Sequence, residues 1–139
     1  KATLLALAER CEAATGPDRE LDAIIFHALG MPLPADFMGV SVALDYDELQ
    51  HAFTMPIGDM QVRYEPPRYT ASIDAALTLV PEGYAAAVGT MFGGEGSRPP
   101  WACIWTPQGE PKFHADAATP ALALLAAILR ALATKDIPQ

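Results

Sequence analysis

The sequence predicts an α+β fold, in which a small antiparallel sheet of three or more strands packs against four helices. Two amphipathic segments stand at the start of the chain, short β-like segments lie between residues 84 and 114, and a long apolar segment follows Thr119. The links between the β-like segments are short, and strands joined by short links pair antiparallel. We therefore expect a helical hairpin at the N-terminus and a long helix at the C-terminus.

The two N-terminal segments, residues 3–14 and 17–29, each repeat apolar residues at the spacing of one helical face. Gly30 follows the second segment and is a typical helix-ending residue. Because the connection between the segments is short, we expect the two helices to form a hairpin. The predicted buried stripes are Leu4, Leu7, Ala8 and Cys11 in the first helix and Leu21, Ile24, Ile25, Ala28 and Leu29 in the second.

The segment of residues 31–67 is rich in proline, and no hydrophobic period persists in it. Within it, Met60–Tyr64 alternates apolar and polar residues, which predicts a short edge strand. Residues 46–53 are compatible with a short helix or a strand. We predict one domain over residues 1–139, in which residues 31–67 form a loop-rich, insertion-like segment, and loop-rich segments of this length are commonly functional or mobile.

The C-terminal half is expected to hold a third helix, a block of strands and a long last helix. The third helix begins at Thr70 or Ser72, both of which suit a helix N-cap. Thr119 followed by Pro120 is a strong helix start, and the broad apolar face of the segment after it implies burial. The expected strands are residues 84–92, 101–106 and 111–114.

The second of these strands carries an aromatic stripe. Trp101, Cys103 and Trp105 alternate with Ala102 and Ile104, so the first three share one face of the sheet. The two tryptophans belong to an aromatic set of the strand block that also includes Tyr84, Phe92 and Phe113. Such a set could stack bases or sugars, but it is also typical of a sheet core that faces helices. We predict that it belongs to the core.

Composition places the chain among ordered globular proteins. It has 139 residues, of which 51% are hydrophobic and 19% charged, so it can bury a core without disulfide staples. We expect Cys11 and Cys103 to behave as small buried apolar residues, which favours a reducing compartment. No run of about 20 apolar residues is present, so we expect no membrane span.

The net charge of −8 argues against a protein that binds nucleic acid directly by neutralising phosphates. The distribution of charge is more informative, because residues 20–62 contain seven acidic residues and no Lys or Arg. This tract is either a solvated face that keeps the chain soluble or a surface offered to a basic partner. The candidate partner-binding residues are Asp36, Asp45, Asp47, Glu48 and Asp59.

No motif for catalysis, metal binding or a cofactor is recognisable in the sequence. No zinc-binding spacing and no nucleophile elbow occur. His114 and Asp116 could face the same way on a strand, but they form a single pair. The glycines of residues 93–96 precede two prolines and a strand, so they resemble a hairpin loop more than a phosphate cradle. We therefore predict no metal, no cofactor and no enzymatic activity.

Three stretches, residues 12–22, 66–81 and 114–124, resemble the phage ABA sandwich domain family. The match covers both ends and the middle of the chain. The resemblance implies helices packed on a sheet, an origin in a phage or prophage, and the cytoplasm of a bacterial host as the place of action. It brings no catalytic residues to transfer.

We accordingly expect a phage or prophage accessory protein that acts by binding another protein. A sharper hypothesis is an acidic inhibitor of a host defence complex of the CRISPR type. In this hypothesis, the acid-only tract of residues 20–62 occupies the basic channel in which the complex holds nucleic acid. One alternative is a small enzyme or small-molecule-binding protein. Another is a virion or assembly component, which self-association into a homo-oligomer would favour.

Overall fold

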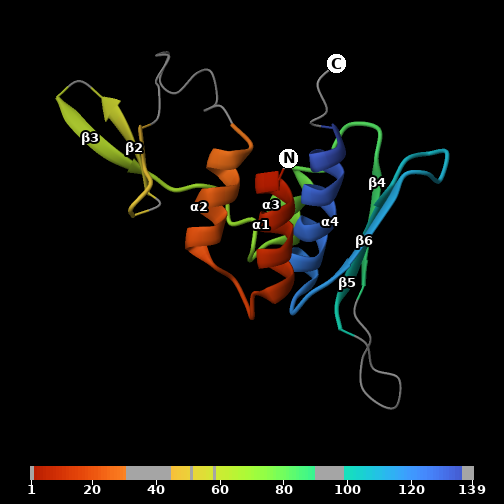
Figure 1. The fold of residues 1–139 in the computed structure, drawn as a ribbon. Helices are drawn as coiled ribbons and strands as arrows, with labels where there is room; N and C mark the ends of the chain where they lie inside the picture. Colours follow the sequence, from red (N-terminus) through yellow and green to blue (C-terminus); the bar gives the residue numbers. More distant parts are fainter. Residues whose placement is uncertain (1, 31–44, 51, 58, 90–98, 136–139) are drawn as a thin grey trace. The chain divides into compact units, whose positions relative to one another are not determined.

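The computed structural model describes residues 2–30, 45–50, 52–57, 59–89 and 99–135 (Figure 1). They form four helices and two three-stranded antiparallel sheets, which confirms the α+β prediction. The chain divides into two compact units, one of Lys1–Asp18 with Arg68–Gln139 and one of Arg19–Pro67. The second unit begins before the predicted insertion-like segment, because it includes the second helix. The single domain over residues 1–139 stays a prediction.

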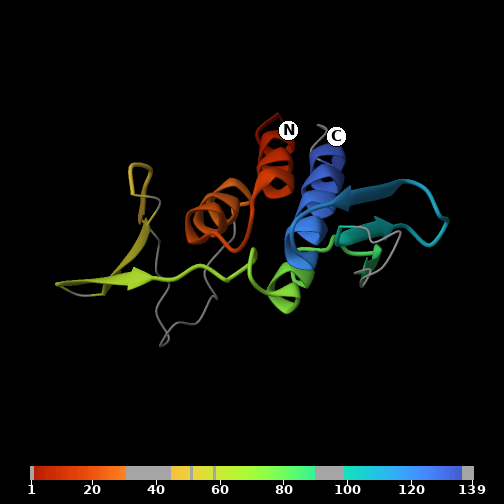
Figure 2. The same ribbon diagram turned by 90° about the horizontal axis from the view of Figure 1, so that it is seen from below.

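The first unit is built in three layers (Figures 1 and 2). One layer is a sheet in the order β4-β5-β6, the next is helix α4, and helix α1 packs on the far side of α4. A short helix, α3, also contacts α4. The bounds are α1 Ala2–Ala13, α3 Ile73–Leu77, β4 Ala85–Gly89, β5 Trp101–Trp105, β6 Lys112–Asp116 and α4 Pro120–Lys135.

Helix α4 is the centre of this unit, as its composition predicts. The side-chain oxygen of Thr119 accepts a hydrogen bond from the N–H of Leu122 at 3.2 Å, so the predicted helix start is confirmed. Every residue from 121 to 129 is buried. Its alanines let the sheet and α1 both approach the helix closely, which explains how one helix can serve as the core of two interfaces.

The prediction that the tryptophans face the helices is wrong. Strand pairing places Ala102, Ile104 and Ala115 on the face that packs against α4, where all three are buried. Trp101 and Trp105 lie on the opposite face. Phe113, the cross-strand neighbour of Ile104, shares the face that packs against α4. Alternation along β5 shows that the two tryptophans share a face, but it does not tell which face meets a helix.

The second unit contains α2 (Arg19–Ala28) and a sheet in the order β1-β2-β3. Strand β3 (Met60–Tyr64) is the predicted edge strand. Among residues 46–53, left open between helix and strand, residues 46–47 end β1 (Asp45–Asp47), residues 48–50 form a turn, and residues 52–53 begin β2 (Ala52–Ile57). The sequence pattern does not predict this middle strand, because it contains Pro56 and proline is rare in strand interiors.

Aromatic rings form the core of the second unit. Phe26 of α2 meets Phe53 of β2 edge to face, with ring centroids 5.1 Å apart, and Tyr64 of β3 lies 5.6 Å from Phe26. Tyr46 of β1 contacts Phe53 at 4.7 Å. This cluster explains why the buried face of α2 includes Phe26, which the predicted stripe omits, while Ala28 of that stripe is exposed.

Candidate functional site

The predicted acidic site does not form a single patch in the described residues. Asp47 and Glu48 are exposed at the turn between β1 and β2, whereas Asp59 is exposed at the turn between β2 and β3. The two turns lie at opposite ends of β2, roughly 17 Å apart at about 3.4 Å per residue. Asp45 begins β1, and Asp36 lies outside the described residues.

One of the predicted partner-binding residues also has a local structural role. The carboxylate of Asp47 accepts hydrogen bonds from the N–H groups of Leu49 at 2.9 Å and Gln50 at 3.4 Å. This is the side-chain turn that aspartate commonly makes in loops. Asp47 therefore holds the turn that exposes Glu48.

Tyr46 shows how the acidic groups act together near this turn. Its ring stacks on His27, with centroids 4.0 Å apart and planes 14° from parallel. Burial raises the pKa of Tyr46 above its ordinary value of 10.0, and the carboxylates of Glu48, Glu20 and Asp47 raise it further. Glu20, on the first turn of α2, thus belongs with the acidic turn, although the predicted site left it out.

Charge is divided unevenly between the two units. The unit of residues 19–67 has eight acidic residues and two arginines, a formal charge of −6. The other unit has nine acidic and seven basic residues, a formal charge of −2. The negative charge predicted from the acid-only tract is therefore a property of one folded unit.

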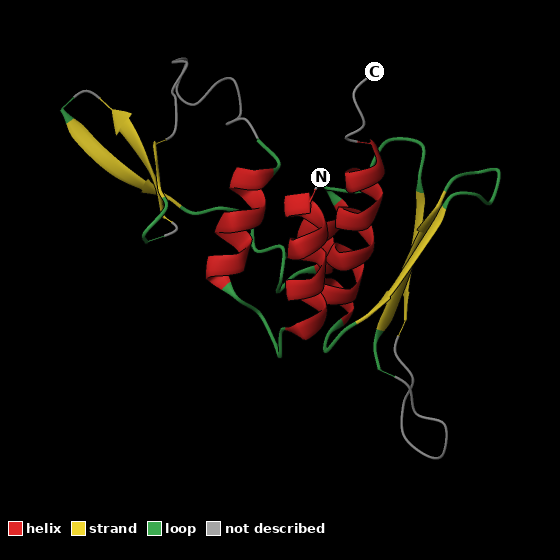
Figure 3. Cartoon of the chain, viewed as in Figure 1, coloured by secondary structure: helices red, strands yellow, loops and turns green. Residues whose placement is uncertain are grey.

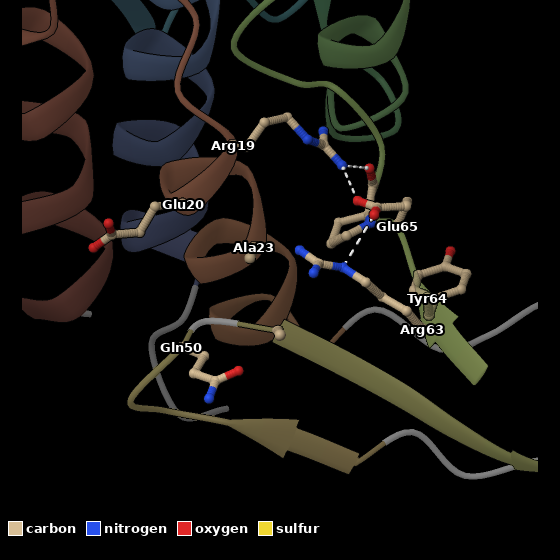
Figure 4. A pocket seen from close by; sticks show the side chains of 9 residues that line it. Arg19, Glu20, Ala23, Gln50, Arg63, Tyr64 and Glu65 are labelled. Atoms are coloured by element: carbon tan, nitrogen blue, oxygen red, sulfur yellow. Dashed lines mark hydrogen bonds and ion pairs between the residues drawn. The ribbon is translucent and has the colours of Figure 1, made fainter. Parts of the chain in front are cut away.

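A polar hollow of about 210 Å³ lies within the second unit (Figure 4). Glu65, one of its lining residues, accepts a hydrogen bond from Arg19 at 3.1 Å and pairs with Arg63 at 3.1 Å. Arg19 also donates to the carbonyl oxygen of Pro66 at 2.9 Å and to the buried carboxylate of Asp22 at 2.8 Å.

Both arginines of the hollow are thus engaged by protein oxygens, so they do not offer a ready anion site. Their arrangement indicates a structural role. Arg19 is the first residue of the unit and Pro66 is next to its last, so this one side chain closes the unit on itself. We call the contacts of Arg19 with Asp22, Glu65 and Pro66 the arginine clasp.

A second candidate site is the face of the β4-β5-β6 sheet that points away from α4, called the outer face below. Two adjoining hollows of about 240 and 320 Å³ lie on it, and Trp101, Cys103 and Lys112 line both. Strand pairing assigns to this face Ala85, Ala87 and Gly89 of β4, Trp101, Cys103 and Trp105 of β5, and Lys112, His114 and Asp116 of β6.

The outer face contains the predicted histidine–aspartate pair. Nε2 of His114 lies 3.0 Å from Oδ1 of Asp116, which confirms that the two side chains face the same way. The ring of Trp101 runs nearly parallel to that of His114, at 16° with centroids 6.2 Å apart. A Cβ at Gly89 would come within 2.6 Å of the indole of Trp101, so glycine makes room for this ring.

The outer face has the residue types of a thiol site, but the arrangement is open. Cys103 is a free, buried thiol directly across the strands from His114. His114 and Asp116 are both about half exposed, at 49% and 52%. Catalytic groups usually work in an enclosed cleft that excludes water. Of the other histidines, His27 stacks on Tyr46, and His51 lies outside the described residues.

The part of the chain that the structure describes holds neither a cluster of metal-ligating side chains nor a helix that could span a membrane. No group of three or more His, Cys, Asp or Glu side chains there is placed to hold a metal ion. None of the helices described has the length and apolar character that a membrane crossing needs. Comparisons of the chain with protein-family models, with curated proteins and with solved structures give no match. The likeness to the phage ABA sandwich domain family stays a prediction.

Proposed function

We propose that this chain is a phage or prophage accessory protein that acts by binding a basic protein partner through the acidic unit of residues 19–67. The observation that carries the proposal is the location of the charge. Six of the eight net negative charges of the chain fall in this unit. Glu20, Asp47, Glu48 and Asp59 are all exposed on it.

The sharper form of the proposal is inhibition of a host defence complex of the CRISPR type. Such complexes hold nucleic acid in positively charged channels. The two acidic turns lie roughly 17 Å apart, about the length of five base steps of duplex DNA. An acidic hairpin of this length can compete with phosphates for basic side chains, and complementary charge speeds its association.

The first experiment is a pull-down from the native bacterial host, repeated at low and at high salt. A basic nucleic-acid-binding complex that is captured at low salt and released at high salt supports the proposal. The captured complex is then purified, loaded with its guide RNA, and tested for DNA binding with and without the chain. We expect the chain to displace DNA.

Two charge-matched double variants separate the acidic unit from net charge. Glu48→Lys with Asp59→Lys reverses one exposed acid at each acidic turn, whereas Glu9→Lys with Glu82→Lys reverses two exposed acids of the other unit. Both variants have a net charge of −4. We expect the first to weaken partner binding at least about tenfold, consistent with loss of two close charge pairs, and the second to bind nearly as wild type.

Equal loss of binding in the two variants would mean that only the total charge matters. Equal retention would mean that the partner does not touch the acidic turns. Either result overturns the proposal. Asp47→Asn separates the charge of Asp47 from its structural role, since asparagine can keep the side-chain turn while it removes the charge.

A further inference from the structure

Two of the three strands of the outer face, β4 and β5, present apolar residues where a solvated sheet face would be polar. Helices α1, α3 and α4 all lie on the other side of the sheet (Figures 2 and 3). Within the described residues of this unit, no helix or strand packs over the outer face. The middle strand nevertheless places Trp101 and Trp105 there, both partly exposed, on either side of the buried Cys103. Antiparallel sheets that face water usually alternate apolar and polar residues, so this face has the composition of one that is covered.

The pattern of residues on the outer face is complementary to itself. Its polar strand, β6, carries Lys112 at one end, His114 in the middle and Asp116 at the other end. Consider a two-fold axis that runs between two such faces, perpendicular to the strands and level with His114. This operation turns the strand end for end, so Lys112 of each copy lies opposite Asp116 of the other.

The same two-fold rotation also turns the middle strand, β5, end for end. Cys103 is the cross-strand neighbour of both His114 and Ala87, so the two-fold axis crosses β5 at the level of Cys103. Trp101 of one copy then lies opposite Trp105 of the other. The hollows beside these indoles, of about 240 and 320 Å³, give the rings of the second copy space to pack.

We propose that two copies of this chain form a symmetric dimer through the outer face. Opposite charges meet at both ends of the polar strand and apolar groups meet along the middle strand, so one surface serves both partners. A small ligand would explain the hollows, but it would not explain the opposite charges placed symmetrically about His114. This inference does not rest on the proposed function, which concerns the other unit.

The size of the face sets the expected strength of the dimer. Three strands of five residues, spaced by about 4.8 Å, cover roughly 16 Å by 14 Å. A standard stable interface buries about 800 Å² on each partner, so this face alone is small. We therefore expect a dimer that dissociates in the micromolar range or above, and that is visible as an equilibrium with monomer.

Sedimentation velocity over a wide range of concentrations tests the dimer, and tryptophan fluorescence tests its location. The chain has two tryptophans, Trp101 and Trp105, and both lie on the outer face, so the whole indole signal comes from it. We expect the indole emission to shift on dilution at the concentration where the dimer dissociates. Neither signal depends on knowing any other partner.

Charge-swap variants make the test specific for the two-fold arrangement. Lys112→Asp and Asp116→Lys each place like charges opposite one another, and each should weaken the homodimer at least about tenfold. A mixture of the two variants should form a heterodimer, because Asp at 112 and 116 of one chain then faces Lys at 112 and 116 of the other. The double variant with both changes should form a homodimer again.

Circular dichroism and thermal unfolding check that the variants are folded, and the mixed sample provides its own control. The proposal is overturned if the wild-type chain stays monomeric at every concentration, or if the two variants mix without association. A monomer whose indole emission responds to an added apolar small molecule would likewise overturn it, and would assign the hollows to a ligand.

Discussion

At the scale of single residues, Tyr46 links the acidic turn to the core of its unit. Its ring stacks on His27 and contacts Phe53, while its hydroxyl group interacts electrostatically with Glu48, Glu20 and Asp47. Burial and these carboxylates both disfavour the phenolate, so the folded state holds the phenolic proton more tightly than the unfolded state. The pKa of Tyr46 is therefore raised in the folded chain.

This pKa shift predicts a specific loss of stability in alkali. Tyr46 contributes stability that is fully present below its ordinary pKa of 10.0 and is lost as pH rises through the raised folded value. We expect the unfolding midpoint of the wild type to fall more steeply above pH 10 than that of Tyr46→Phe. Thermal unfolding measured over this pH range checks it, with Tyr84→Phe in the other unit as the control. Parallel curves for wild type and Tyr46→Phe would contradict the prediction.

The predicted site shows what sequence reasoning can reach at this scale. The acid-only tract is visible because charge is visible in a sequence, and it corresponds to a unit with a real excess of charge. The tertiary placement of each acid is not visible. Asp47 has a turn to hold and Asp59 lies at the other end of β2, whereas Glu20, which the prediction left out, comes near Tyr46 through the packing of α2 against β1.

At the scale of elements, hydrophobic spacing and turn residues predict most of the helices and strands. Helices α1 and α4 and strands β3, β5 and β6 are found where hydrophobic spacing and turn residues place them. The short link between β5 and β6 contains a turn, in which the N–H of Gly109 donates a hydrogen bond to the carbonyl oxygen of Thr106 at 2.8 Å. Strand β2 is missed because it contains a proline, and the face of β5 is misassigned because alternation gives two faces without telling which one meets a helix.

One ion pair between two helices offers a measurable test of the packing of the first unit. Arg130 of α4 donates two hydrogen bonds to the carboxylate of Glu12 of α1, each 2.6 Å long, and these raise the pKa of Arg130. Both side chains are about 70% buried, so the pair is better shielded from solvent than a surface salt bridge. We expect Glu12→Gln to lower the free energy of unfolding by about 1–2 kcal/mol.

The matched control for Glu12 is Glu9→Gln on the same helix, where the side chain is exposed. It should change the free energy of unfolding by less than about 0.5 kcal/mol. Denaturant unfolding followed by circular dichroism gives both values. A double-mutant cycle of Glu12→Gln with Arg130→Gln then isolates the pair, and a coupling energy near zero would show that the two helices are held by apolar packing alone.

At the scale of the whole molecule, the chain passes from one unit to the other and back at residues 18–19 and 67–68. Each unit has hydrogen bonds of its own that join its two chain segments next to these crossing points. In the first unit, the hydroxyl group of Thr70 accepts a hydrogen bond from the N–H of Asp18 at 2.8 Å and donates one to its carbonyl oxygen at 3.2 Å. In the second unit, the arginine clasp joins the start of α2 to residues 65 and 66. Such an arrangement lets the second unit act as an insertion whose ends meet.

The arginine clasp predicts that the stability of the two units can be changed separately. Arg19→Leu removes one partner of the buried carboxylate of Asp22 and the link between the two ends of the unit. We expect it to destabilise the second unit by about 2 kcal/mol. Amides of β2 and β3 should then exchange with solvent about 30-fold faster in native-state hydrogen exchange, while those of β5 and α4 keep their protection.

Arg63→Gln is the matched control for the clasp, since Arg63 pairs with the same carboxylate of Glu65 but is 70% exposed. An exposed pair contributes little, so the exchange rates of β2 and β3 should change less than about threefold. Should Arg19→Leu speed exchange equally in β2, β5 and α4, the two units would unfold as one cooperative domain over residues 1–139. Selective exchange would instead show that the acidic unit unfolds independently of the other unit. The binding of a basic partner would then stabilise the acidic unit without changing the stability of the unit that carries the outer face.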